Sequence, residues 1–465
     1  MKNKTQFVVL GAGYAGMTLA VHLDNKLSEK NFQVILVNIN SYHELIQEAH
    51  LVAGGFRRPE QVRIPISDLV RDTGIQFIQS GVQKVNASEN KVILENSNDI
   101  NYDFLVVALG SSTKFFGIKN ATRNSLTIKS IDDASTIHDK IMDLITNNRD
   151  KDDGDTRTSN VVIVGGGPTG VGVAGALADL VSHHSQNQSA TKIPELKIVT
   201  ASSTILPGFD QRIIDKVTQI LRRKGVTITT NGTVTTVKQQ SITLKTEDIR
   251  SHVPSSLTIW TPGIKGYDLS FEPKIKKTQS KRIIVNEFCQ IDDHPNIFCI
   301  GDIAAIADNS GRIKNPPLGH IAISQAIYLA EAIPEDFIYG KKPSEKFNPD
   351  VNIRILSLGL EDYIGFLNNI VVTGDIARVV KEFKKEAHLE SVGSGEISFA
   401  ANIYKDDPIS NLLSSIFLAR FSISKTLKDK VPSLYTDSKS ESDRTNILSE
   451  KAKDFQIKLK IKDKR

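Results

Sequence analysis

Two glycine-rich segments have the residue spacing most closely tied to chemistry in this chain. Gly11, Gly13 and Gly16 form a G-x-G-x-x-G motif, which follows the apolar run at 7–10 and precedes a helical pattern over Met17–Leu27. The first glycine allows a tight turn, the second lets a pyrophosphate approach the backbone, and the third lets helix and strand pack closely. Free N–H groups at the helix N-terminus favour an anion. We therefore predict a dinucleotide site; the alternative is a glycine turn that binds nothing.

The same motif occurs a second time, much later in the chain. Gly165, Gly167 and Gly170 follow the apolar run Val161–Val164 and open a helical pattern over Val171–Val181. Because the two motifs are far apart, the repeat predicts a second domain of the same kind. Two such units in the correct context are far more specific for dinucleotide binding than one.

Other apolar runs predict the elements that must position both turns. Strands are expected at 32–37, 74–85, 91–95, 102–111, 196–200, 226–230, 257–263 and 296–305, and helices at 131–145, 209–224 and 316–333. The charged and aperiodic segment 146–160 is typical of a surface linker. Alternation of buried strands and helices predicts an α/β protein.

Composition places the chain among ordinary soluble globular proteins. It has 465 residues, 39% hydrophobic and 24% charged, with a net charge of +5. This mild charge, without interleaved basic and aromatic residues, gives no reason to expect nucleic acid as a partner. The start of the chain leaves no room for a signal peptide, and no run of 18 apolar residues predicts a membrane span. Two cysteines do not make a disulfide scaffold, so a reducing cytoplasm is expected.

The order of motifs is similar to a known family. GAGYAG, YDFLVVALGS, GGGPTG, WTPG and IFCIGD resemble the flavoprotein reductases with two dinucleotide domains. NSYHELIQEAHLVAGG, HPNIFCIGDIA and PPLGHIAISQAIYLA are most similar to type II NADH:quinone oxidoreductases. The resemblance covers about residues 5–335. It implies two Rossmann-like domains, the second inserted into the first, plus a C-terminal α+β membrane-associating region.

The domain division that follows has four segments. The FAD-binding domain would comprise 1–125 and 267–340, the NAD(P)H-binding domain 126–266, and the C-terminal region 341–465. The resemblance implies FAD as cofactor and NAD(P)H as electron donor. Residues implied for FAD are Gly11, Gly13, Ala15, Gly16, Asn38, Val82, Ala108, Gly110, Asp302, Gly319 and His320. Those implied for NAD(P)H are Gly165, Gly167, Thr169, Gly170, Thr200 and Gly263.

Several of these residues have a stated role in the resemblance. Asn38 replaces the usual ribose-binding acid, and an amide can still hydrogen-bond a hydroxyl. Val82 would meet the adenine through its backbone. Asp302 would bind the ribityl or phosphate region, and the alternative is an N-cap. The helix starting near Gly319 and His320 would point its positive end at the flavin pyrimidine and stabilise the anionic reduced flavin.

The implied reaction passes electrons from NAD(P)H through FAD to a quinone. His320 and Gln325 are the candidate catalytic residues: the family's glutamine-rich quinone motif has His320 and Ser324 in place of glutamines, while Gln325 remains. His320 would donate a proton to quinone or to flavin N1, since imidazole titrates near neutrality. The alternative for His320 is a helix-start residue that caps or packs.

The chain departs from the family at three acidic positions. Glutamates usual in the second helix are replaced by Gly172 and Ala176, so the usual proton route is not supported. The carboxylate that would hold the NADH ribose is replaced by Thr200, so no preference for NADH over NADPH is expected; Arg212 is the nearest downstream cation for a 2′-phosphate. Two other functions therefore stay open: a reductase with a soluble redox acceptor, and a flavin-binding protein with a decayed nicotinamide site.

Cysteines and histidines elsewhere predict no further chemistry. Cys289 and Cys299 are expected on strands as structural thiols, and no C-x4-C lies beside the first helix. This argues against disulfide reductase and sulfide:quinone chemistry. His43 and His50 have no metal-like ligands near them in sequence, so no metal site is expected.

The C-terminal region contains a candidate membrane-binding segment. Apolar residues over 409–430 fall near one helical face and lysines follow, while the last residues form a basic tail. Such a helix can lie in a membrane interface next to anionic lipid. We predict a cytoplasmic protein that is peripheral on the inner face of the cell membrane. The same helix face could instead pack on the protein core or form a homodimer interface.

Overall fold

The structure is a computed structural model of the chain. It describes residues 4–27, 31–96, 99–147, 159–187, 193–308, 310–349, 353–367 and 370–394. The predicted amphipathic helix at 409–430 and the basic tail lie outside the described residues.

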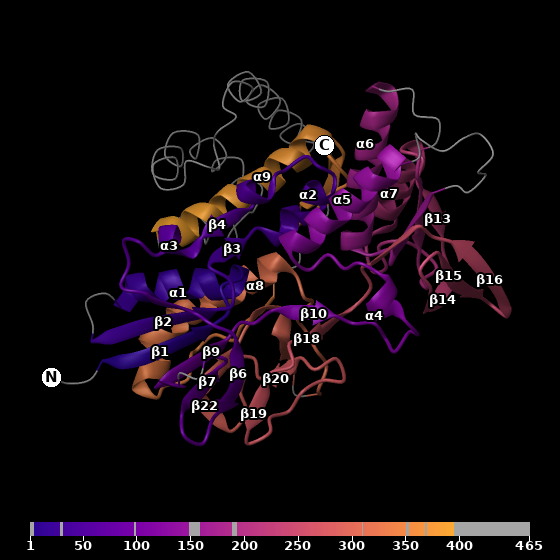
Figure 1. The fold of residues 1–465 in the computed structure, drawn as a ribbon. Helices are drawn as coiled ribbons and strands as arrows, with labels where there is room; N and C mark the ends of the chain where they lie inside the picture. The colour runs from indigo at the N-terminus through magenta and orange to yellow at the C-terminus, as the bar shows by residue number, and fades with distance from the viewer. Residues whose placement is uncertain are drawn as a thin grey trace, which may run out of the picture.

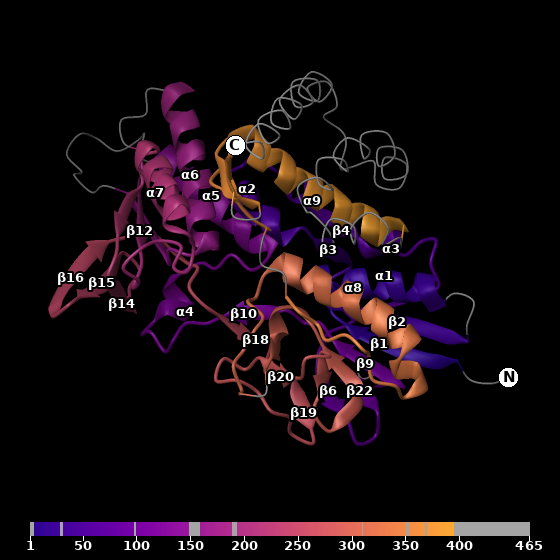
Figure 2. The ribbon, with the colours of Figure 1, turned by 180° about the vertical axis from the view of Figure 1, so that it is seen from behind.

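A six-stranded sheet forms the centre of the first unit. In spatial order it contains β21 (Gln290–Ile291), β22 (His294–Cys299), β9 (Phe104–Val107), β1 (Thr5–Leu10), β2 (Phe32–Asn38) and β5 (Gln76–Gln79). All neighbours pair in parallel except β21 with β22. Helices α1 (Tyr14–Leu27) and α8 (Gly319–Glu335) lie side by side on one face, as Figures 1 and 2 show. Apolar runs without alternation suit these central strands, because both faces are covered.

Smaller elements complete the first unit. A second sheet, antiparallel except at one edge, has the order β19 (Ser270–Glu272), β6 (Val82–Asn86), β7 (Lys91–Leu94) and β8 (Asp99–Asn101), with β19 joining β6 in parallel. Between β2 and β5 lie β3 (Tyr42–Glu44), η1 (Ile46–Glu48), α2 (Ala49–Ala53), η2 (Pro59–Gln61), β4 (Arg63–Pro65) and α3 (Ile66–Leu69). Later elements are β20 (Ile283–Val285), η3 (Gly301–Ile303), β23 (Ala304–Ile306) and η4 (Phe337–Tyr339).

The second unit is inserted between β9 and β22 of the first. Its parallel sheet has the order β13 (Thr227–Thr229), β12 (Glu195–Val199), β11 (Asn160–Val164) and β17 (Leu257–Trp260), with helices α6 (Pro168–Asn187) and α7 (Gln211–Arg223). An antiparallel sheet of β14 (Gly232–Val237), β15 (Ser241–Thr246) and β16 (Ile249–Pro254) extends from it. Connections contain β10 (Ser111–Thr113), α4 (Ala121–Asn124), α5 (Ile131–Asn147) and β18 (Ile264–Gly266). The predicted α/β fold with an inserted second unit is confirmed; the residue bounds of the four segments stay a prediction.

A third region follows the first unit. Strands β24 (Ile353–Ser357), β25 (Tyr363–Leu367) and β26 (Ile370–Thr373) form an antiparallel sheet, and α9 (Gly374–Ser394) lies along α1 (Figure 1). This is the α+β character expected for the C-terminal region. Among the described residues, no helix is long and apolar enough to cross a membrane.

Two strand predictions are wrong in detail. The segment 74–85 is not one strand, because β5 joins the central sheet whereas β6 joins the antiparallel sheet, and the chain changes sheet at Ser80 and Gly81. Cys289 lies in a turn with φ +61° and not on a strand. In both cases the apolar pattern correctly predicted a buried segment but did not predict the turn that interrupts it.

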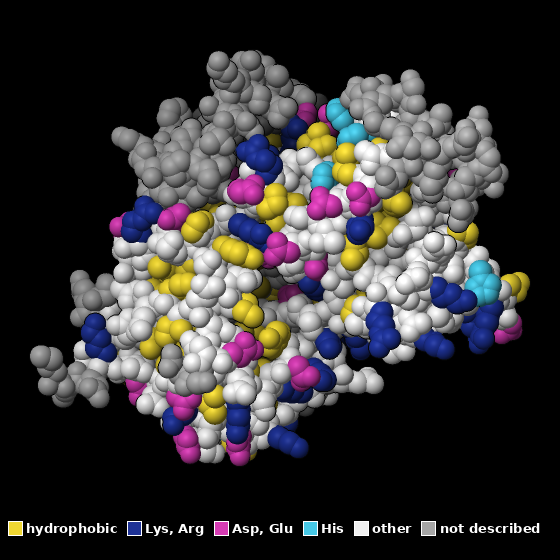
Figure 3. Space-filling model, in the orientation of Figure 1, with side chains coloured by type: hydrophobic (Ala, Val, Ile, Leu, Met, Phe, Trp, Pro, Cys, Tyr) yellow, Lys and Arg dark blue, Asp and Glu magenta, His cyan; other side chains and the backbone are white. Residues whose placement is uncertain are grey.

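Charged side chains are unevenly distributed over the face shown in Figure 3. Acidic and basic residues are interspersed over the first unit, whereas lysines and arginines gather over the β14–β16 edge. At that edge Lys245 and Arg250 are exposed, and Ile249 is 72% exposed. The mixed surface of the first unit agrees with the mild net charge of +5.

Candidate functional site

The first glycine turn connects β1 to α1. Gly11 has φ +100°, and a Cβ on it would lie 2.6 Å from the carbonyl oxygen of Ala108. A Cβ on Gly16 would lie 1.8 Å from the carbonyl oxygen of Gly11, so both positions require glycine because of the chain's own packing. A Cβ on Gly13 would meet no atom of the described chain within 4 Å. The chain's packing therefore does not require the middle glycine, and contact of Gly13 with a pyrophosphate stays a prediction.

Asn38, at the end of β2, holds this turn in place. Its Oδ1 accepts a hydrogen bond from the Ala12 N–H at 3.0 Å, and its Nδ2 donates to the carbonyl of Asn40 at 2.9 Å. The amide retains one lone pair and one N–H for a further partner. Contact between Asn38 and a ribose stays a prediction, and the structure adds a second role in positioning the turn.

The second glycine turn connects β11 to α6 with nearly the same geometry. Gly165 has φ +104°, and a Cβ on it would lie 2.6 Å from Thr261 Oγ1. A Cβ on Gly170 would lie 2.0 Å from the carbonyl oxygen of Gly165, whereas one on Gly167 would meet no described atom within 4 Å. Thr169 is exposed in the first turn of α6. This turn also has the shape expected for phosphate groups at a helix N-terminus.

Other residues predicted for the second site have structural contacts of their own. Thr200 is buried and its Oγ1 accepts the Ser202 N–H at 3.3 Å. Gly263 has φ +70°, and a Cβ there would collide with the ring of Phe116. Arg212 pairs with both carboxylate oxygens of Asp210, at 2.9 and 3.1 Å, which lowers the pKa of Asp210. The only cation proposed for a 2′-phosphate is thus engaged with a carboxylate.

Asp302 lies beside the first glycine turn, although it is far from it in sequence. A Cβ on the preceding Gly301 would lie 3.3 Å from the Cβ of Ala15, so η3 packs directly against the start of α1. Asp302 Oδ2 accepts a hydrogen bond from Ser111 Oγ at 2.9 Å, and Lys129 Nζ donates to the same Ser111 Oγ at 3.3 Å. The N-cap of η3 is Ile300, so the alternative role of Asp302 as an N-cap is wrong.

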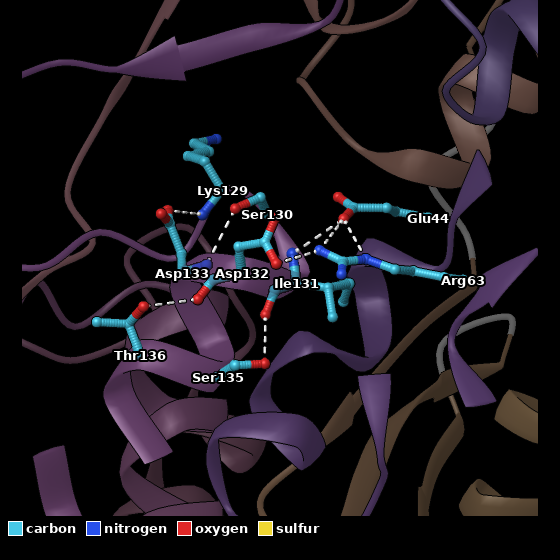
Figure 4. A network of polar contacts seen from close by, with 9 residues as sticks. All are labelled: Glu44, Arg63, Lys129, Ser130, Ile131, Asp132, Asp133, Ser135 and Thr136. Atoms are coloured by element: carbon cyan, nitrogen blue, oxygen red, sulfur yellow. Dashed lines mark hydrogen bonds and ion pairs between the residues drawn. The ribbon is translucent and has the colours of Figure 1, made fainter. Parts of the chain in front are cut away.

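Lys129 and Ser111 were missed as site residues in the sequence. Burial lowers the pKa of Lys129, while nearby Asp302 and Asp133 oppose that shift. Ser130 Oγ accepts the Asp133 N–H at 3.0 Å, and Asp133 Oδ2 accepts the Lys129 N–H at 2.8 Å (Figure 4). The S-x-x-D spacing of this cap is a signal that could have located the helix start and thus Lys129.

An ion-pair network on the other side of the same helix start fixes its position (Figure 4). Arg63 bridges Glu44 at 3.1 Å and Asp132 at 2.6 Å. Glu44 Oε1 also accepts the Ile131 N–H at 3.3 Å. Since Glu44 and Arg63 lie on β3 and β4, the network joins the segment after β2 to the start of α5.

Helix α8 begins at Gly319, close to the predicted position. Its N-cap Leu318 makes no side-chain capping bond. A Cβ on Gly319 would lie 2.1 Å from Gln47 Nε2, so the Gln47 side chain of η1 packs against this helix end. His320 is half-buried in the first turn, and Ser324 Oγ donates to its carbonyl at 2.9 Å. Leu318 therefore leaves the first N–H groups of α8 uncapped by its own side chain, and such groups favour negative charge.

Gln325 lies deeper in α8 and is fully buried. Its Oε1 accepts the N–H of Gly301 at 2.7 Å, which holds the turn that presents Asp302. Its Nε2 is buried without a hydrogen-bond partner among the described residues. The geometry favours a positioning role, and direct contact with a substrate stays a prediction.

Remaining FAD candidates lie at strand ends near the same turn. Val82 is buried at the start of β6, and Ala108 is buried directly after β9. Gly110 has φ +71°, and a Cβ there would meet no described atom within 4 Å. Together with Asp302 and the start of α8, these residues line the carboxyl ends of the parallel strands, where open α/β sheets bind ligands.

Comparison with known sequences decides the family. A sequence profile described as "Pyridine nucleotide-disulphide oxidoreductase" matches residues 5–326. The chain belongs to the pyridine nucleotide-disulphide oxidoreductase family. The match spans both glycine turns and the Gly-Asp turn of this oxidoreductase.

Relatives and solved structures refine the comparison. The chain is 25% identical to the type II NADH:quinone oxidoreductase of Staphylococcus haemolyticus, over 86% of this chain and 98% of that protein. The structure of NDH2 from Plasmodium falciparum in complex with NADH has a TM-score of 0.74 at 16% identity, covering 91% of this chain and 99% of that one. The sulfide:quinone oxidoreductase of Aquifex aeolicus has a TM-score of 0.72 at 21% identity, covering 85% and 92%. The resemblance predicted from the motifs is confirmed.

The sequence has no C-x4-C pair of the kind that disulfide-type flavoenzymes need. Cys289 and Cys299 are free and buried, and burial raises the pKa of both thiols. A raised pKa disfavours the nucleophilic thiolate. Both behave as the structural thiols that were expected.

The two missing glutamates have a packing explanation. A Cβ on Gly172 would lie 3.2 Å from the carbonyl oxygen of Ser357 and 3.7 Å from the ring of His50. His50 Nε2 in turn hydrogen-bonds Ser357 Oγ at 2.9 Å, and burial lowers the pKa of His50 to about 3. Ala176 faces Gly54, and a Cβ added to Gly54 would lie 3.1 Å from the Cβ of Ala176. Helix α6 therefore packs closely on α2 and β24, with little room for glutamate side chains.

Proposed function

We propose that this oxidoreductase binds FAD in its first unit and oxidises NAD(P)H bound in its second. The observation that carries the proposal is the paired glycine geometry. In each turn the outer glycines are required by the chain itself, while the middle glycine faces space that a pyrophosphate fits. The NADH complex of the similar Plasmodium falciparum protein supports NAD(P)H as the donor.

Residues of the first site have distinct roles in this proposal. Gly13 and the N-terminus of α1 hold the pyrophosphate, and Asp302, supported by Ser111, binds the ribityl or phosphate region. The N-terminus of α8 stabilises negative charge on the pyrimidine side of the ring system. FAD held by these residues would supply hydride and electron transfer chemistry between a nicotinamide and the acceptor. His320 and Gln325 stay candidates for contact with the acceptor.

A quinone is the proposed electron acceptor. The similar Staphylococcus and Aquifex proteins are both named quinone oxidoreductases. A lipid-soluble quinone requires contact with a membrane, which residues 409–430 would provide from the cytoplasmic side. A soluble redox protein is the alternative acceptor, and a homodimer would use the same helix face.

Anaerobic rapid mixing tests the proposal. Purified protein should be yellow, with one FAD per chain, and NADH or NADPH should bleach the flavin absorbance. Later addition of a short-chain quinone should restore the colour. A colourless protein that cannot be reconstituted with FAD would exclude the cofactor. If NADH or NADPH bleaches the flavin but quinone does not reoxidise it, the electron acceptor would be assigned as a soluble redox protein.

A flavin-binding protein with a decayed nicotinamide site is the second candidate. It is favoured by buried Thr200 in place of a ribose carboxylate and by the pairing of Arg212 with Asp210. This candidate predicts a yellow protein that neither NADH nor NADPH bleaches.

A further inference from the structure

Two histidines from distant parts of the chain form a buried pair against the first glycine turn. His43 lies on β3 and His388 on α9, and their side chains are 0% and 3% exposed. His43 Nδ1 is 2.8 Å from the carbonyl oxygen of Ala12, and His43 Nε2 is 3.1 Å from His388 Nε2. Helix α9 thus reaches the turn through two hydrogen bonds in series.

The chemistry of these bonds determines where each proton is. A carbonyl oxygen only accepts, so His43 Nδ1 carries the hydrogen and donates it to Ala12. In a neutral ring His43 Nε2 is then an acceptor, and His388 Nε2 must be the donor. His388 Nδ1 is the remaining acceptor and has no hydrogen-bond partner in the part of the chain that the structure describes. Burial lowers the pKa of both histidines, which keeps the rings neutral and the order of donors unchanged.

Ala12, the turn residue at the end of this series of hydrogen bonds, is held through both its N–H and its carbonyl. The N–H of Ala12 donates to Asn38, and its carbonyl accepts from His43. The ring of Tyr14, also in the glycine motif, lies 4.5 Å from the ring of His388 and 5.5 Å from that of His43. Loss of the His388 donor would leave His43 Nε2 buried without a partner, which destabilises the buried His43 ring that holds the Ala12 carbonyl.

We propose that His388 is a positioning residue for FAD, through which α9 holds the pyrophosphate-binding turn in its binding shape. The proposal rests on the proposed function in one respect, namely that FAD binds at the first glycine turn. It assigns the third region a role in cofactor retention as well as in packing.

Neighbouring titratable groups set the expected pH dependence. On α1, Tyr14 and His22 face the histidine pair, and Lys26 lies near His22. His22 Nε2 hydrogen-bonds Ser391 Oγ at 2.6 Å. On η1 and α9, Glu48 and Lys381 form an ion pair at 3.2 Å, and Lys385 lies between Glu48, Glu382 and Glu386. Tyr363 of β25 faces Lys381. The buried histidines must be neutral. The packing of α9 on the first glycine turn therefore loses stability as pH falls below the ordinary histidine pKa of about 6.5.

The test measures FAD release from the purified holoprotein by flavin fluorescence. His388→Phe keeps ring packing but removes the donor, and release should be about tenfold faster at pH 7.5. His388→Gln presents an amide N–H in place of Nε2–H, and release should stay within about twofold of wild type. Ser391→Ala is the matched control, since it removes an α1–α9 hydrogen bond one turn away without touching the glycine turn.

The pH profile separates positioning from general stability. Wild-type release should accelerate below about pH 6.5, by up to about tenfold per pH unit for each titrating histidine. His388→Gln cannot be protonated there and should show a shallower profile. Equal acceleration in His388→Phe and Ser391→Ala, or an unchanged pH profile in His388→Gln, would overturn the proposal. Absence of FAD from the wild type would instead refute the proposed function.

Discussion

The two glycine turns have almost the same backbone and different supports. Both turns begin with a glycine at positive φ, +100° at Gly11 and +104° at Gly165. In both, the last glycine of the motif packs on the carbonyl of the first glycine. In the second turn the carbonyl of Gly166 accepts the backbone N–H of Leu206 at 2.7 Å, within its own unit. In the first turn the equivalent residue, Ala12, is held by the side chains of Asn38 and His43.

If both turns bind nucleotides as proposed, this difference predicts a longer residence of the nucleotide at the first turn than at the second. A turn held by side chains from several regions, including α9, is preorganised for a resident cofactor, because ordering costs are met before binding. The second turn is held by contacts from its own unit, the Leu206 N–H and Thr261 Oγ1, which donates to the Gly165 carbonyl at 3.3 Å. Such local support suits a substrate that enters and leaves. The strand-end residues follow the same division: Asn38 bonds its turn, whereas Thr200 bonds the following Ser202 and not its turn.

Gly13→Val should have the largest effect, a folded but colourless protein. A Cβ at this position meets no described atom within 4 Å, so we expect the fold to tolerate valine, whose side chain would fill the place proposed for the pyrophosphate. Absorbance at the flavin band measures the loss, and circular dichroism checks the fold. Retention of FAD by this variant would show that the cofactor does not lie on the first turn.

Gly167→Val makes the same change in the second turn and should separate the two sites. FAD should remain bound, while reduction by NADH and NADPH should slow at least about a hundredfold, equivalent to about 2.7 kcal/mol. Anaerobic stopped-flow measures the rate. Loss of flavin colour in this variant would mean that the two turns do not act independently.

Thr200→Glu should have the smallest effect of the three. Wild-type discrimination between NADH and NADPH should be weak, and a carboxylate at this strand end should favour NADH by about 1–3 kcal/mol. The ratio of kcat/KM values measures the shift, and Ala201→Glu, at an exposed neighbouring position, is the control. A wild type that already prefers NADH about a thousandfold, roughly 4 kcal/mol, would assign discrimination to another residue.

Much of the fold could be predicted from the sequence because its signals are local. An apolar run followed by a glycine motif and a helical pattern specifies a strand, a turn and a helix. The apolar pattern over 316–333 also predicted α8, while its start near Gly319 and the insertion of the second unit followed from the family resemblance. The break between β5 and β6 did not, because which sheet a strand joins depends on its neighbours in space.

The sequence by itself determined that two glycine turns of one design exist, since their backbone shape depends on the glycines and the adjacent strands. Only the tertiary structure decided what surrounds the first turn. Packing brings Gly301 against Ala15, buries Gln325 behind it, and places His388 in contact with His43 across 345 positions of sequence. No periodicity encodes such contacts, because they depend on how helices and sheets pack once formed.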